Sequence, residues 1–261
     1  SSASTALALT IDTTAPEAPV ITTTTALTNN PTPDIAGTAE AGSTVTLFSG
    51  DTSLGTATAD GNGDFSITSS VLTDADYTLT VKATDAAGNI SEPSTELSIT
   101  IDTTAPEAPV ITTDSFVTNI NTPTIEGIAE AGSSIELFSG DESLGTATAD
   151  SDGNFSILSI LEFSDGSYSF KVKSTDAAGN ESAESSEITI EIDTTPPDAP
   201  TITTTTTTTN VTTPTIEGTA EVGSTVELFI GETSVGTTTA GADGAFSIPT
   251  GELAEGDYSL T

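Results

Sequence analysis

Acidic residues recur at matching places along this chain, and their types and spacing are those of a ligand-binding site. The aspartate of "IDTTAPEAPVI" at residues 11–21 returns in the identical segment at 101–111 and in "IDTTPPDAPTI" at 192–202. A glutamate recurs in the turn sequences "TAEAG", "IAEAG" and "TAEVG", and an aspartate with an asparagine recurs in "TDAAGN". The candidate metal ligands are Asp12, Glu40, Asp85 and Asn89; Asp102, Glu130, Asp176 and Asn180; and Asp193 and Glu221.

The chemistry that these side chains could perform is the binding of a hard cation. Ca²⁺ takes about six to eight oxygen ligands from carboxylates, amide and backbone carbonyls and water. Carboxylates that converge from three separate segments repel one another unless a cation lies between them. The threefold recurrence therefore predicts Ca²⁺ at each linker.

A structural explanation of the same acids stays open. Aspartate and asparagine favour turns because their side chains bond to the nearby backbone, so each acid could serve only its own turn. "DGNGD" at 60–64 and "DSDGN" at 150–154 resemble the start of an EF-hand loop, but a tight hairpin turn also explains the third copy, "GADGA" at 241–245. Glu17, Glu107 and Asp198 recur in the proline segments and are reserve candidates.

The composition excludes several classes of function. The chain has 39 acidic residues against 3 lysines, a net charge of −36, so nucleic acid and anionic membrane surfaces are poor partners. It contains no Cys, His, Met or Trp, which excludes disulfides, soft-metal sites and His-dependent nucleophilic catalysis. No apolar run approaches the roughly 20 residues that span a membrane, so direct membrane insertion is not expected.

The elements that must position the acids are strands. Apolar residues alternate with Thr and Ser at period two, as in "STVTLF" and "ELSITI", and Gly/Asp/Asn turns separate the runs. No stretch carries a helical stripe. The fold class predicted is all-β: tandem immunoglobulin-like antiparallel β-sandwiches of about seven strands each, arranged as an extended rod. In such a sandwich the start of the first strand and the turns that carry the candidate ligands share one pole.

A period of about ninety residues sets the domains. Residues 12–101 and 102–192 are expected to be complete domains, and 193–261 an incomplete one that lacks the end of its sixth strand and all of its seventh. Residues 1–11 match 91–101 and are expected to be the last strand of a preceding, absent domain. The simplest explanation is a window cut from a longer array. The alternative is that another copy donates the missing strand.

All three tyrosines, Tyr77, Tyr168 and Tyr258, stand at the start of the sixth expected strand. An acidic residue lies three places before each of them. This pattern is typical of a tyrosine corner, in which the phenol caps the preceding turn.

Taken together, "DTTAPEAPVI", "GTAEAGSTVTLF", "DGNGDFSI" and "ATDAAGN" resemble the tandem bacterial immunoglobulin-like domains of giant repetitive surface adhesins, which are typically exported by type I secretion. The resemblance covers essentially the whole chain. It implies Ca²⁺ at the domain junctions, an extracellular location at the bacterial surface, and a stalk that projects a distal ligand-binding module. It carries no catalytic residues.

The function expected is therefore a Ca²⁺-stiffened extender segment and not an enzyme. Its partners would be the neighbouring domains of the same chain, while a sugar, protein or surface would be bound elsewhere in the full-length protein. Two alternatives remain: a subunit of an extracellular filament closed by strand exchange, and a carbohydrate- or ice-binding module. The scarcity of aromatic residues, 5% of the chain, argues against sugar stacking.

Overall fold

The computed structural model describes residues 7–205 and 208–261, and it contains strands and turns but no helix within those ranges. Three separate hydrophobic cores form, one in each sequence repeat. We call residues 12–101 the first repeat, 102–192 the second and 193–261 the third. The chain divides into two compact units between Asp193 and Thr194, so the first two repeats belong to one unit and the third to another.

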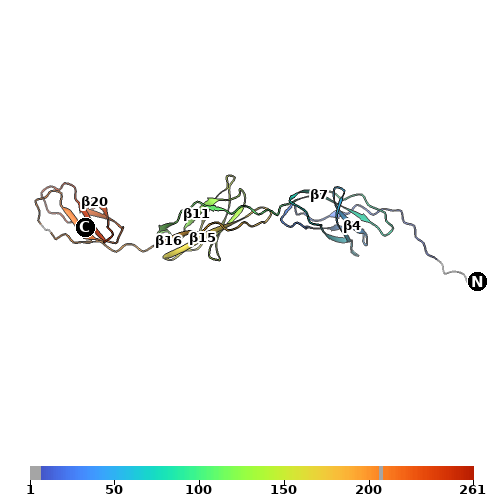
Figure 1. The fold of residues 1–261 in the computed structure, drawn as a ribbon, viewed down its shortest axis with the longest axis horizontal. Coiled ribbons are helices and arrows are strands. Elements are labelled where there is room, and N and C mark those ends of the chain that lie inside the picture. The colour runs from blue at the N-terminus through green and yellow to red at the C-terminus, as the bar shows by residue number, and fades with distance from the viewer. Residues whose placement is uncertain (1–6, 206–207) are drawn as a thin grey trace, which may run out of the picture. The chain divides into compact units, whose positions relative to one another are not determined.

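The first repeat is a sandwich of two sheets (Figure 1). One has the strand order β1-β3-β6 and the other β2-β8-β7-β4-β5. The strands are β1 (Val20–Ile21), β2 (Leu27–Thr28), β3 (Asp34–Thr38), β4 (Thr44–Ser49), β5 (Thr52–Thr58), β6 (Asp64–Thr68), β7 (Ala75–Thr84) and β8 (Leu97–Ile101).

The second repeat has the same topology, with sheets β9-β11-β14 and β10-β16-β15-β12-β13. Its strands are β9 (Val110–Ile111), β10 (Phe116–Thr118), β11 (Thr124–Ile128), β12 (Ser134–Ser139), β13 (Glu142–Thr148), β14 (Asn154–Leu158), β15 (Gly166–Thr175) and β16 (Ile188–Ile192).

The third repeat has sheets β17-β18-β21 and β19-β20. The pairing that β4 and β7 make in the first repeat is represented here by an isolated bridge between Ile230 and Leu260 and by two backbone hydrogen bonds between Phe229 and Thr261. Its strands are β17 (Thr201–Ile202), β18 (Thr215–Thr219), β19 (Thr225–Ile230), β20 (Thr233–Thr239) and β21 (Ala245–Pro249).

The period-two pattern places the apolar residues inside, as the sequence predicts. Val45 and Leu47 on β4 are fully buried, and so are Leu79 and Val81 on β7, which faces the same core. The alternate positions, such as Thr44, lie at the surface. An all-β fold of tandem immunoglobulin-like sandwiches is therefore confirmed.

The first expected strand differs from the prediction, because it is split between the two sheets. β1 pairs antiparallel with β3, whereas β2 pairs parallel with β8 at the edge of the other sheet. The complete repeats consequently have eight strands rather than about seven. The crossing is fixed locally by the hydroxyl of Thr23, which accepts a hydrogen bond from the Ala36 amide at 2.8 Å.

A glycine in the central strand of each three-stranded sheet lets the neighbouring strands pack closely beside it. A Cβ built on Gly127 would lie within 3.0 Å of the Phe155 ring and of the Val110 carbonyl oxygen. Gly37 and Gly218 meet the equivalent phenylalanine and carbonyl. The first strand after each proline segment, such as β9, can therefore pair with the central strand only where that strand has a glycine at this position.

The start of the chain bears on one expectation from the sequence. Residues 1–6 lie outside the described residues, so most of the strand expected at 1–11 is not described. Leu7, Leu9 and Ile11 are largely exposed and lie outside any strand. The assignment of this segment to a preceding domain stays a prediction.

Candidate functional site at the linker pole

The turn between β7 and β8 is built around the carboxylate of Asp85. One oxygen, Oδ1, accepts hydrogen bonds from the backbone amides of Ala87 and Asn89, at 2.9 and 2.8 Å. The other, Oδ2, accepts one from the side-chain amide of Asn89 at 2.8 Å. Gly88 supplies the left-handed conformation, with φ of 93°. The acid therefore serves its own turn, as the structural explanation of the sequence pattern expects.

The same asparagine also binds the linker. Asn89 Nδ2 donates to the backbone carbonyl of Asp12 at 3.2 Å. In the second repeat, Asn180 Nδ2 donates to the carbonyl of Asp102 at 2.8 Å and to Asp176 Oδ2 at 2.8 Å. Three of the four predicted residues in each repeat therefore come together, but the linker aspartate contributes its carbonyl and not its carboxylate.

The carboxylates of the linker aspartates have a local partner instead. Asp12 Oδ1 accepts the Thr14 amide at 3.0 Å, and Asp102 Oδ1 accepts the Thr104 amide at 3.1 Å. These are bonds from two residues further along the chain, which are typical of an Asx-turn. These two bonds fix the backbone conformation at the start of each proline segment.

The predicted glutamates lie in the turns after the third strands. The carbonyl of Glu40 accepts the Ser43 amide, and Glu130 and Glu221 make the equivalent bonds. The Glu40 side chain lines a hollow of about 400 Å³ together with Glu17, one of the reserve candidates. The hollow also touches Val20 on β1 and Thr38 on β3.

The geometry does not gather enough acids for a metal in the way the sequence predicts. Across residues 7–205 and 208–261, no group of three or more acidic side chains lies close enough together to hold an ion. At the turn of Asp85, the Asn89 amide nitrogen donates to the Asp12 carbonyl oxygen and to Asp85 Oδ2. A cation in this place would need oxygen acceptors, and this nitrogen is a donor. The predicted carboxylates therefore do not converge in this arrangement, and Ca²⁺ at the linker pole stays a prediction.

Hydrogen bonds to the charged carboxylates lower the pKa values of Asp85 and Asp176 in these turns. The Asn89 side-chain amide, with the backbone amides of the turn, lowers the pKa of Asp85 from 3.8. For Asp176, partial burial is the largest single effect and raises the pKa, but bonds from Asn180 and two backbone amides together outweigh it, and the pKa is lowered. Both aspartates are accordingly charged at neutral pH.

A second acid holds the linker from the other side, and the sequence reasoning missed it. Asp74 Oδ1 accepts the Thr103 amide at 3.0 Å and its hydroxyl at 2.7 Å, while Oδ2 accepts the Thr104 hydroxyl at 2.7 Å. These bonds, led by that from the Thr104 hydroxyl, lower the pKa of Asp74 from 3.8. The signal was available, since an acid stands three residues before every tyrosine, but we read it only as part of the tyrosine corner.

The tyrosine corners are confirmed in all three repeats. Each phenol donates to the carbonyl four residues earlier: Tyr77 to Thr73 at 3.0 Å, Tyr168 to Ser164 at 3.1 Å and Tyr258 to Ala254 at 3.1 Å. The phenol therefore ties down the loop before the long strand. In the first repeat this loop carries Asp74.

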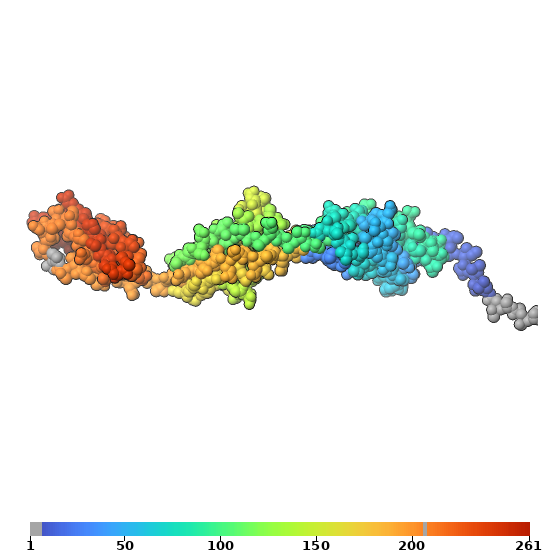
Figure 2. All heavy atoms as spheres, viewed as in Figure 1, coloured from blue at the N-terminus to red at the C-terminus, as the bar shows by residue number. Residues whose placement is uncertain are grey.

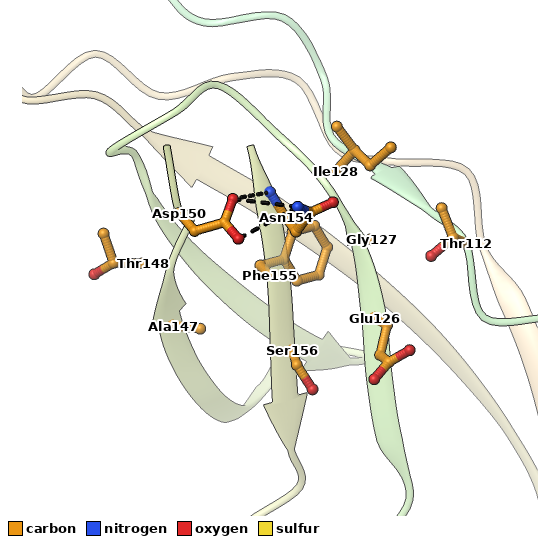
Figure 3. Close-up of a pocket in the computed structure, with 10 residues that line it drawn as sticks. All are labelled: Thr112, Glu126, Gly127, Ile128, Ala147, Thr148, Asp150, Asn154, Phe155 and Ser156. Carbon is orange, nitrogen blue, oxygen red and sulfur yellow. Dashed lines mark hydrogen bonds between the residues drawn. The ribbon is translucent and has the colours of Figure 1, made fainter. Parts of the chain in front are cut away.

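The EF-hand-like segments form tight turns that cross from one sheet to the other, and not the hairpin turns that the sequence pattern predicts, because β13 and β14 belong to different sheets. Asp150 Oδ1 accepts the backbone amides of Asp152 at 2.9 Å and Asn154 at 2.8 Å, and the Asn154 side chain turns toward the same carboxylate (Figure 3). These bonds lower the pKa of Asp150, led by the backbone amide of Asn154. The turn borders an open hollow of about 470 Å³ on the outer face of β11 and β14, which also exposes Glu126. On the face of the first two repeats shown in Figure 2, no deep cleft is visible.

The three lysines lie on the long strands β7 and β15. Lys171 pairs with Glu184 at 2.8 Å, and this bond raises the pKa of the lysine. Lys173 lies 3.9 Å from Glu181. Two of the lysines thus lie beside acids, whereas Lys82 lies over the Phe48 ring, 6.0 Å from its centroid.

Comparison with known proteins finds a protein family that matches the first and second repeats. A family model described as "Bacterial Ig-like domain" matches residues 5–103 and 110–194. Exoglucanase B of Cellulomonas fimi is 34% identical over 170 residues, which are 58% of this chain and 14% of that protein.

Two solved structures are similar at lower identity. A tetra-tandem repeat from the extending region of a large adhesion protein is 24% identical, with a TM-score of 0.32, over 96% of this chain and 70% of that one. The BSP domain of a biofilm-associated protein is 22% identical, with a TM-score of 0.29, over 70% of this chain and 30% of that one.

Proposed function

The chain belongs to the family of bacterial Ig-like domains, and on that premise we propose that it is an extender segment of a large bacterial surface adhesin. In this role it holds a distal ligand-binding module away from the cell, in the extracellular space. The chain spans only 14% of the Exoglucanase B sequence that it matches, so the activity of the whole protein belongs to this proposal as well.

The observation that carries the proposal is repetition without specialisation. The first and second repeats have the same strand order, the same tyrosine corner and the same Asp–Asn turn against the linker. A small-molecule site is usually a concave, mostly apolar pocket with a few convergent polar groups. The hollows found on the described surface are open and have mixed polar and apolar linings.

A spacer must resist force, and this property can be measured on the chain itself. A fully extended chain spans at most about 3.3–3.6 Å per residue, so one unfolded repeat of about ninety residues adds roughly 300 Å of contour length. Single-molecule force spectroscopy of the chain should show two equal steps of that size, from the first and second repeats. Unfolding without discrete steps would contradict a load-bearing role.

We include Ca²⁺ in the proposal as a stiffening ion at the junctions. Its support is the recurrence of the linker aspartate with the turn glutamate and the Asp–Asn pair, together with the net charge of −36. The residues that would hold it are those of the linker pole, although their present hydrogen bonds do not leave a ready set of acceptors. Extracellular modules bind Ca²⁺ with Kd of about 10⁻⁴–10⁻³ M.

The test of the calcium component is a stoichiometry. Equilibrium dialysis should show that Asp102→Ala binds one ion fewer than the parent chain. Asp51→Ala, which removes an acid from the β4–β5 turn, is the matched control and should bind the same number of ions as the parent chain. Equal stoichiometry in the parent chain and Asp102→Ala would remove the ion from the proposal and leave the spacer role standing.

A second candidate is the spacer of a secreted polysaccharide hydrolase. The similarity to Exoglucanase B favours it, because the matched part is a small share of that protein. The two candidates share the mechanical role and differ in what the spacer joins. Sequencing the coding region on both sides of these repeats distinguishes them, since one predicts further repeats and the other a catalytic domain.

A further inference from the structure

The junction between the first and second repeats carries a continuous set of hydrogen bonds that no recurring-acid argument predicts. It begins in the first repeat, where Asp74 binds Thr103 and Thr104 of the linker through three bonds. The Asp102 amide also donates to the Thr28 carbonyl at 3.1 Å, which continues the pairing of β2 with β8. Residues 102–104 are thus fixed to the first repeat on two sides.

The second repeat grips the same linker segment from its own turn. Asn180 Nδ2 uses both of its N–H donors, one on the Asp102 carbonyl and one on Asp176 Oδ2. Asp176 in turn is fixed by the backbone amides of Gly179 and Asn180, at 2.7 and 2.9 Å. The amide that reaches the linker is therefore held in one orientation by its own turn.

A direct bond closes the set. Asn29 Nδ2, in the loop after β2, donates to the Gly179 carbonyl at 2.9 Å, which joins the first repeat to the second without the linker. Gly179 has φ of 95°, and a Cβ at this position would lie 3.5 Å from the Asn29 side chain. In the sequence, asparagine stands at the place of Asn29 in the other repeats too, as Asn119 and Asn210.

We propose that Asp74, Asn180 and Asn29 form a clamp whose hydrogen bonds already order the junction between the first and second repeats before any cation binds. We call these three residues the linker clamp. Asp74 binds Thr103 and Thr104 in the linker, and Asn180 binds the Asp102 carbonyl. Asn29 binds the Gly179 carbonyl of the second repeat.

The clamp can be tested in the whole chain because the chain has no cysteine. Thr56→Cys on β5 and Thr146→Cys on β13 place spin labels at matching exposed positions of the two repeats. Pulsed electron resonance then measures the distribution of distances between them. With a chelator present throughout, the labelled chain should give a single narrow distribution.

Variants of the three clamp residues test whether the clamp is what narrows the distance distribution. Asp74→Ala should abolish the narrow distribution in chelator, and so should Asn180→Ala and Asn29→Ala. Asp64→Ala removes the same charge from the start of β6, at the opposite end of the first repeat from this linker, and should leave the distribution unchanged. Thermal unfolding of each variant checks that both sandwiches remain folded, and Asn29→Ala is the safest variant because Asn29 holds no turn of the second repeat.

Two results would overturn the clamp. One is a narrow distribution that persists in Asp74→Ala and in Asn29→Ala. The other is a broad distribution in the parent chain that narrows only when Ca²⁺ is added. Neither result affects the spacer role, which the force measurement tests separately.

Discussion

Replacing Gly127 by alanine should detach β9, the first strand of the second repeat after the linker, from β11. Gly127 pairs with Ile111 of β9, and β9 has only two residues paired with β11. An added Cβ would lie within 3.0 Å of the Val110 carbonyl oxygen on one side and of the Phe155 ring on the other. Both neighbours are constrained, since one is backbone and the other is a buried ring, so the strain cannot be relieved by a flexible side chain.

The magnitude follows from the cost of inserting a methyl group into a packed interior, which is typically about 1–3 kcal/mol. For a domain of 60–100 residues, 1 kcal/mol lowers the melting temperature by roughly 4–8 °C, so we expect the second repeat of Gly127→Ala to melt about 5–20 °C lower. Gly37→Ala should act in the same way on the first repeat, because its Cβ would meet the Phe65 ring and the Val20 carbonyl.

Hydrogen exchange followed by mass spectrometry is the suitable assay, because it reports each repeat separately. In Gly127→Ala, peptides that contain β9 and β11 should lose protection, while those of the first repeat keep it. Gly61→Ala is the matched control, since a Cβ there meets no atom within 4 Å and its backbone is not in the left-handed region. Unchanged protection of β9 in Gly127→Ala would refute the argument that the close packing of β9 and Phe155 beside β11 requires this glycine.

Two further predictions concern the loop before the long strand. Tyr168→Phe removes the bond to the Ser164 carbonyl and should cost about 0.5–1.5 kcal/mol of the unfolding free energy of the second repeat, as measured by urea denaturation; a midpoint equal to that of the parent chain would show that the corner is not stabilising. The pKa of Asp74 is lowered in the folded chain from 3.8, so its contribution to order at the junction is fully present above that pH and is lost as pH falls through the lower folded value. The spin-label distribution should therefore stay narrow from pH 7 to 5 and broaden below about pH 4, and a chain that broadens well above pH 5 would contradict this assignment.

The alternation of apolar and polar residues was enough to determine the class of fold and the residues of the core. Val45 and Leu47 point inward because side chains on a strand alternate between its two faces, and no distant contact is needed to know this. The tyrosine corner is equally local, since each phenol reaches a carbonyl four residues away. The turn of Asp85 and Asn89 could be predicted for the same reason.

The tertiary structure alone decided which groups meet at the linker. The Asn89 amide binds the carbonyl of Asp12, 77 positions away in sequence, and Asp74 binds Thr103, 29 positions away. Every residue carries a carbonyl, so a bond to the backbone leaves no mark on the type of residue that accepts it. The recurrence of Asp12 in the sequence therefore suggested a carboxylate ligand, whereas the folded chain uses its backbone. Likewise, the antiparallel pairing of β1 with β3 brings Glu17 and Glu40 to one hollow, and strand pairing depends on distant partners that the local pattern does not encode.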